Sequence, residues 1–144
     1  KNTQNRAELW PIFYPLLNTA TIPLADSIRI QDARTEEPIP FEHASNGVSF
    51  ALTMPPLGSK AIRIAYRQRT PLRTMEYILT STKQWGKPLE LATFRIVVPD
   101  SLRLTHMSMS YDSLIQRGND LEYLIRRRAF MPRSNLIIKW KRRQ

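Results

Sequence analysis

Apolar and polar residues alternate along most of this chain, and such a period of two is typical of β-strands. The clearest case is the segment 61–67, where Ile62, Ile64 and Tyr66 alternate with small or basic residues. The same alternation predicts strands in the ranges 27–31, 48–53, 93–98, 102–105 and 136–141. Strands with one apolar side are typical of antiparallel sheets, because parallel strands are covered on both sides and are apolar throughout.

Turn-forming residues separate these segments at short intervals. Asn46-Gly47 predicts a tight turn, because both residue types tolerate a positive φ, and the segments 55–59 and 117–120 are further breaks. Short strands with frequent turn signals predict a sandwich or a barrel. We therefore expect residues 1–144 to form one mainly-β domain, an antiparallel two-sheet sandwich of the immunoglobulin-like kind with about eight or nine strands.

Three segments depart from this pattern. Prolines crowd the N-terminal segment, and since proline cannot donate to a sheet ladder we expect an irregular edge strand around Trp10 to Leu17. The segment 112–117 predicts one helical turn, capped by Asp112 and ended at Gly118. The segment 120–130 fits a helix or a strand that ends in a basic loop.

Few residues are of the types that support catalysis or hold a cofactor. The chain has no cysteine, which excludes disulfides, thiolate metal sites and cysteine nucleophiles. Glu42 and His43 are adjacent, so on a strand they point to opposite faces, and neither can orient the other. His106 is in phase with Leu102 and Leu104, which predicts a half-buried, hydrogen-bonded histidine. We expect no catalytic residue, no metal site and no cofactor, and so a protein that is not an enzyme.

The charge is strongly positive and is concentrated near the C-terminus. Twenty-two Lys and Arg against twelve Asp and Glu give a formal net charge of +10. From residue 126 onward there is no acidic residue, but there are eight basic ones, namely Arg126, Arg127, Arg128, Arg133, Lys139, Lys141, Arg142 and Arg143. They are either solvated outward positions on two strands or a basic patch that binds lipid head groups, an acidic glycan or nucleic acid.

Aromatic residues bear on which of these ligands is favoured. Few aromatic side chains lie among the basic residues, which makes nucleic acid the less favoured ligand. Trp10 and Trp140 fall in apolar segments and are expected in the core. Trp85 is surrounded by Lys83, Gly86 and Lys87, so we expect an exposed aromatic ring on which a sugar or a base could stack.

The segment 77–99 resembles a pattern found in uncharacterised bacterial extracytoplasmic domains. It contains Tyr77-Ile78-Leu79-Thr80, then Trp85-Gly86, then a long strand that ends at Pro99. The resemblance implies an immunoglobulin-like sandwich in an envelope or secreted protein, and it brings no catalytic residue. Because the chain begins with Lys1 rather than methionine, we expect a piece of a larger protein.

Two hypotheses for function follow. The first is a non-catalytic interaction or structural module of a bacterial envelope or secreted protein, which contacts a protein partner or the rest of its parent chain. The alternative is a binding domain for an anionic polymer or membrane surface, which uses the basic residues near the C-terminus. A steep dependence of binding on salt would distinguish the second from the first.

Overall fold

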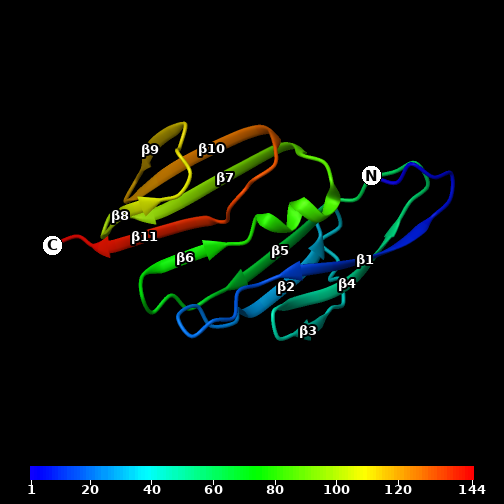
Figure 1. Ribbon diagram of the computed structural model, residues 1–144, viewed down its shortest axis with the longest axis horizontal. Helices are drawn as coiled ribbons and strands as arrows, with labels where there is room; N and C mark the ends of the chain where they lie inside the picture. Colours follow the sequence, from blue (N-terminus) through cyan, green and yellow to red (C-terminus); the bar gives the residue numbers. More distant parts are fainter. The chain divides into compact units, whose positions relative to one another are not determined.

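The protein is mainly β in a computed structural model that describes residues 1–144, with 53% of residues in strands and 4% in helix. Eleven strands and one short 3-10 helix, η1 (Thr80–Trp85), follow one another along the chain (Figure 1). Every pairing between strands is antiparallel, which confirms the predicted class. No helix is long and apolar enough to cross a membrane.

Contacts divide the chain into two compact units, residues 1–69 and 70–144. The first unit contains a three-stranded sheet and a two-stranded sheet. Their strands are, in sheet order, β1 (Glu8–Pro15), β4 (Gly47–Met54) and β3 (Glu42–Ala44), and then β2 (Asp26–Asp32) and β5 (Ile62–Arg67). Both sheets contribute side chains to one core, in which Ile30, Val48 and Phe50 are buried.

The apolar side of β5 lies where the alternation predicts it. Ile62, Ile64 and Tyr66 pack against the core of the first unit, and Arg63 and Arg67 are exposed. In β4 the alternation is complete, with Val48, Phe50, Leu52 and Met54 buried and the residues between them exposed. The predicted turn before β4 is present as well, since Ala44 pairs with Gly47 across the loop Ser45-Asn46.

The reason for the glycine at this turn differs from the predicted one. Neither Asn46 nor Gly47 has a positive φ. A Cβ atom added to Gly47 would instead lie 2.3 Å from the backbone oxygen of Tyr14 and 2.7 Å from Cζ of Phe13. Gly47 is therefore required because β1 approaches β4 closely at this point.

Strand β1 is an edge strand, as the prolines predict, but it begins at Glu8 and pairs with β4 without the expected irregularity. It pairs with β4 alone, and Leu16 just beyond it donates its N–H to the oxygen of Asn46 on the β4 side. Backbone groups of successive residues point to opposite sides of a strand, so Pro11 and Pro15 both direct their nitrogen toward the free edge. The ladder to β4 thus loses no hydrogen bond to either proline.

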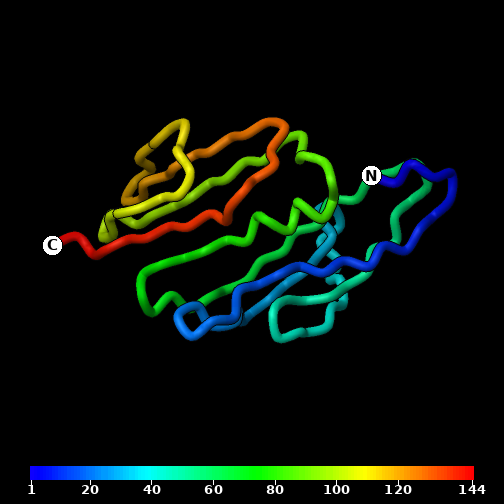
Figure 2. Tube along the Cα trace, viewed as in Figure 1, coloured from blue at the N-terminus to red at the C-terminus, as the bar shows by residue number.

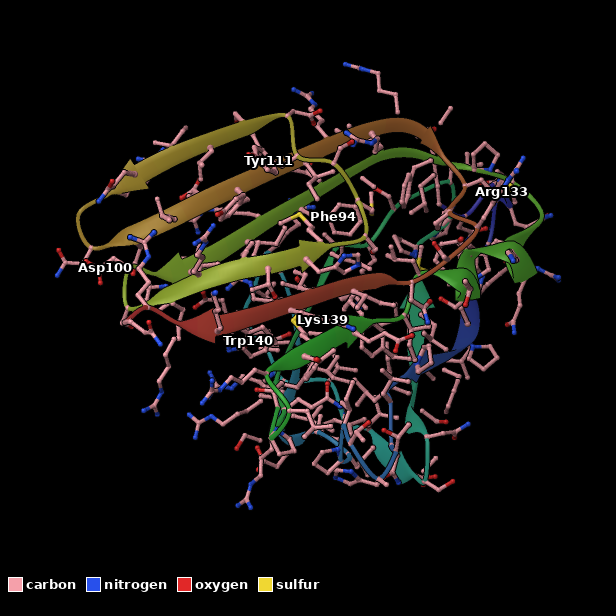
Figure 3. All side chains as sticks on the ribbon, turned by 60° about the vertical axis from the view of Figure 1, so that its left-hand side comes forward. Phe94, Asp100, Tyr111, Arg133, Lys139 and Trp140 are labelled. Carbon is pink, nitrogen blue, oxygen red and sulfur yellow. The ribbon has the colours of Figure 1, made fainter.

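The second unit consists of two three-stranded sheets. Their strands are, in sheet order, β7 (Leu89–Pro99), β10 (Asp120–Phe130) and β9 (Ser113–Arg117), and then β6 (Thr74–Tyr77), β11 (Leu136–Arg142) and β8 (Leu102–Met107). Phe94 and Trp140, on strands of different sheets, both pack against the core residues Leu79, Leu136 and Ile138 (Figure 3). This unit is thus two sheets around one core.

The helical turn predicted for residues 112–117 is wrong. Residues 113–117 form β9, which pairs with β10 through a hairpin whose first loop residue, Gly118, has φ +61°. The sequence of the segment 120–130 fits a helix or a strand, and the whole segment is the strand β10. Asp112 and Gly118, which predict the ends of a helix, have other roles here. Asp112 accepts a hydrogen bond from the backbone of β10, and Gly118 is a turn residue.

The count of eleven strands exceeds the predicted eight or nine. Three of the strands, β3, β6 and β9, have only three to five residues and show no clear alternation. The two compact units each have their own core, and a single domain over residues 1–144 stays a prediction. Figure 2 traces the chain through these strands.

Candidate anion-binding surface

The outward side of the sheet β6-β11-β8 carries most of the basic residues near the C-terminus. In β11, Leu136, Ile138 and Trp140 belong to the core, so the alternation places Lys139 and Lys141 on the opposite side. Arg143 continues this alternation just beyond the strand, where its N–H donates to the oxygen of Ser101. These three cations lie two residues apart, which is about 6.7 Å along a strand.

Strand β8 adds two further groups to the same side. Arg103 pairs with Lys141, and His106 pairs with Lys139. We call the resulting set the basic face, and it comprises Arg103, His106, Lys139, Lys141 and Arg143, all of which are exposed.

His106 reaches this side through an irregularity in β8. The register shifts between Lys139 and Trp140, so that Thr105 is an extra residue opposite them. An extra residue in one strand moves every later side chain to the other side of the sheet. His106 is exposed as a result and Met107 faces the core, so the prediction of a half-buried histidine is wrong.

None of the basic residues of this face is in an ion pair, since all five ion pairs of the chain lie elsewhere. The one acid on the same side of the sheet is Glu76 of β6, whose Oε1 accepts a hydrogen bond from Asn135 at 2.8 Å. Arg103, Lys141 and Arg143, together with Arg142 and Gln144, also line an open hollow of about 490 Å³. The basic face therefore presents unneutralised positive charge to an open surface.

Of the other predicted basic residues, Arg142 lines the hollow beside this face, and four lie outside it. Arg126, Arg127 and Arg128 belong to β10, and Arg133 lies in the loop before β11. Arg126 and Arg128 are exposed and Arg127 is partly buried. The eight predicted residues therefore do not form a single patch.

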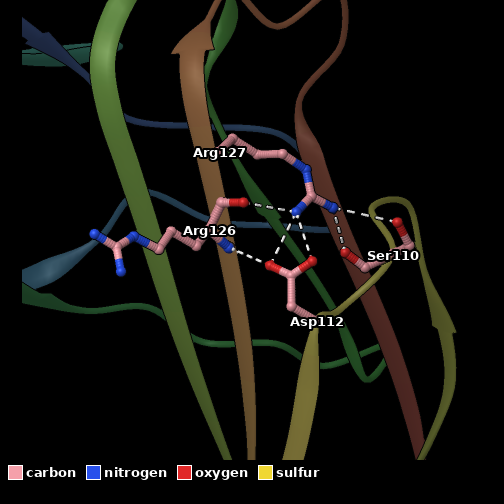
Figure 4. A network of polar contacts seen from close by, with 4 residues as sticks. All are labelled: Ser110, Asp112, Arg126 and Arg127. Atoms are coloured by element: carbon pink, nitrogen blue, oxygen red, sulfur yellow. Dashed lines mark hydrogen bonds and ion pairs between the residues drawn. The ribbon is translucent and has the colours of Figure 1, made fainter.

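Arg127 has a structural role (Figure 4). Its Nη1 donates to both carboxylate oxygens of Asp112 at 3.0 Å, and its Nη2 donates to the oxygen of Ser110 at 2.6 Å. The N–H of Arg126 also donates to Asp112, at 2.6 Å. This backbone hydrogen bond, and then the Arg127 guanidinium, lower the pKa of Asp112 below its usual value.

A second carboxylate on the β7-β10-β9 sheet is neutralised in the same way. Glu122 is only 8% exposed, and its Oε2 lies 2.7 Å from Nη2 of Arg95 and 3.2 Å from Nε of Arg117. Hydrogen bonding from Arg95, with the charge of Arg117, lowers the pKa of Glu122. Arg95, Arg117 and Arg127 thus bind carboxylates, whereas the arginines of the basic face do not.

The three tryptophans fall into two groups. Trp85, in η1, is 63% exposed, and its role as a stacking platform stays a prediction. Trp10 and Trp140 are partly buried against the cores of their units. The basic face contains no Trp, Tyr or Phe.

Sequence reasoning identified part of this surface. Lys139, Lys141 and Arg143 were among the predicted residues, but Arg103 and His106 were not, because they lie outside the stretch of the chain in which basic residues are dense. The alternation of Leu102, Arg103 and Leu104 was the available signal, since it places Arg103 on an outward side.

No group of three or more His, Asp or Glu side chains could hold a metal ion. No protein-family model, curated protein or solved structure matches this chain.

Proposed function

We propose that this chain is a non-catalytic binding module whose basic face binds an anionic polymer or an anionic membrane surface. The observation that carries the proposal is the unpaired state of Arg103, Lys139, Lys141 and Arg143 on one side of one sheet. Like charges directly opposite each other destabilise a sheet, as Arg103 and Lys141 do here. An anion between them would remove that repulsion.

The arrangement favours a ligand with repeated charges. Lys139, Lys141 and Arg143 form a row with a step of about 6.7 Å, and Arg103 and His106 form a second row beside it. Neutralising several such groups releases counterions from a polyanion, which makes the affinity strongly dependent on salt. Because the face has no Trp, Tyr or Phe on which successive bases could stack, nucleic acid is the less favoured polyanion.

We also propose an immunoglobulin-like sandwich in a bacterial envelope or secreted protein as the setting of this module. Support comes from the residues that resemble such domains, which fall on β6, η1 and β7 in the second unit. That unit consists of two antiparallel sheets around one core, an arrangement that an immunoglobulin-like sandwich requires.

A protein partner is the second candidate ligand, and strand β9 favours it. Leu114 and Ile115 are 44% and 43% exposed, and β9 pairs only with β10, so its other edge is open. An open edge with apolar side chains can add a strand from another chain. Retention of a protein partner by a variant without the basic face would favour this candidate.

The test measures binding to heparin, to short DNA and to vesicles with anionic lipid across a series of salt concentrations. The first variant, R103Q/K139Q/K141Q, removes three charges of the basic face. Its control, R126Q/R128Q/R133Q, removes the same number of charges elsewhere in the second unit. We expect the first variant to lose most of the binding and to reduce the slope of log K against log salt by about 2 to 3 for nucleic acid.

The three ligands identify the class of anion, and the two variants identify the site. Equal losses in both variants would show that net charge alone drives binding, and would contradict the assignment to the basic face. Weak binding of the unmodified protein to all three ligands at physiological salt would also contradict the proposal.

A further inference from the structure

The outward side of the two-stranded sheet β2-β5 contains a second polar hollow, which is separate from the basic face. It has a volume of about 340 Å³ and is lined by Arg29, Gln31, Glu36, Arg63 and Ala65. The other side of this sheet packs on the core through Ile28, Ile30, Ile62, Ile64 and Tyr66. The hollow is thus supported by the core beneath it.

The register places the two arginines across a small residue. Arg29 pairs with Ala65, and Gln31 pairs with Arg63, so the two arginines are diagonal neighbours on one side of the sheet. The methyl group of Ala65 leaves space between them. Neither guanidinium is in an ion pair, and guanidinium groups bind carboxylates and phosphates through paired hydrogen bonds.

Glu36 brings a negative charge to the same hollow from a hydrogen-bonded turn. Oδ1 of Asp32 accepts the N–H groups of Arg34 and Thr35, and the N–H of Glu36 donates to the oxygen of Asp32 at 3.0 Å. Glu36 itself has φ +62°, a conformation that glycine adopts at lower cost. Its carboxylate also lacks an ion-pair partner.

We propose that this hollow binds a small zwitterion with a carboxylate and an ammonium group, as in an amino acid. Arg29 and Arg63 hold the carboxylate over Ala65, and Glu36 accepts the ammonium group. The charges of the three side chains are complementary to such a ligand, whereas a dianion such as phosphate is repelled by Glu36.

The test is a titration of the isotope-labelled protein by NMR, which detects weak binding and locates it through the amide signals of Gln31, Glu36 and Ala65. The probes are glycine, acetate and inorganic phosphate. We expect these amides to shift with glycine at lower concentrations than with acetate or phosphate. Replacing Glu36 by Gln should remove the preference for glycine over acetate.

Three variants separate this site from a general effect of charge. Ala65→Leu fills the hollow without changing the charge, and we expect it to abolish the shifts. Arg63→Gln should weaken glycine binding about tenfold or more, because it removes hydrogen bonds to a charged group. Arg67→Gln is the matched control on the same side of β5, and it should bind glycine within about twofold of the unmodified protein, since Arg67 does not line the hollow.

Two outcomes would overturn the proposal. One is glycine binding that survives Ala65→Leu, or falls as much with Arg67→Gln as with Arg63→Gln. The other is the absence of any shift at these amides with glycine. Thermal unfolding of each variant verifies that the fold is retained, and Arg63→Gln alters an exposed side chain only.

Discussion

The absence of a side chain at Gly47 allows β1 and β4 to lie next to each other. Because an added Cβ would meet a backbone oxygen of β1 at 2.3 Å, the strands must separate to accommodate alanine. We expect Gly47→Ala to lower the free energy of unfolding by roughly 1–3 kcal/mol, as overpacking of a well-packed site does. Urea denaturation measures this change.

Ser49→Ala is a suitable control for this substitution, since Ser49 lies on the same side of β4 two residues further along and is exposed. Its expected effect is within about 0.5 kcal/mol. A loss below about 0.5 kcal/mol for Gly47→Ala would show that β1 does not approach β4 so closely.

At the scale of the element, one carboxylate anchors the segment before β9 to strand β10. Asp112 accepts hydrogen bonds from the N–H of Arg126 and from the guanidinium of Arg127. Because the pKa of Asp112 is lowered in the folded protein, its stabilising effect is complete above the ordinary pKa of about 4 and is lost as the pH falls through the lowered value.

We expect Asp112→Asn to unfold at a lower temperature than the unmodified protein at pH 7. The difference should shrink as the pH falls below about 4, because the native carboxyl group then becomes neutral as well. Thermal unfolding of both proteins across this pH range measures the effect. A difference that stays constant down to the lowest pH would show that the charge of Asp112 contributes nothing.

Strands were predictable wherever alternation extends over six or more residues, as in β4 and β5. Strand β9 was not, since a helix and a strand can both begin after an aspartate and end before a glycine. The side to which His106 points was not predictable either. It depends on the extra residue Thr105, and a bulge is determined by the partner strand β11, which follows more than thirty residues later.

At the scale of the whole molecule, two cores hold the protein together, and no residue is common to both. Ile30 is 2% exposed in the first and Ile138 is 3% exposed in the second. Each change of isoleucine to valine should cost about 0.5–1.5 kcal/mol. In the double variant I30V/I138V we expect the two losses to add within about 0.5 kcal/mol.

Urea denaturation of the two single variants and the double variant provides this comparison. If the loss in the double variant differs from the sum of the two single losses by more than about 0.5 kcal/mol, the two cores are energetically coupled.

Composition and periodicity gave no sign of two cores. The strands of both units alternate in the same way, and the first unit is followed by the second, at residues 69 and 70, without a linker between them. The basic face was only partly predictable for a similar reason, since it joins β8 and β11, which are distant in the chain.

The placement of Pro11 and Pro15 has a consequence for the protein at high concentration. The proposed binding to a polyanion would bring many copies together, and exposed strand edges are where such copies would join into fibres. Along β1 two of the donors that such growth needs are absent, while the ladder to β4 remains intact. This edge is therefore a poor template for the addition of a strand from another copy.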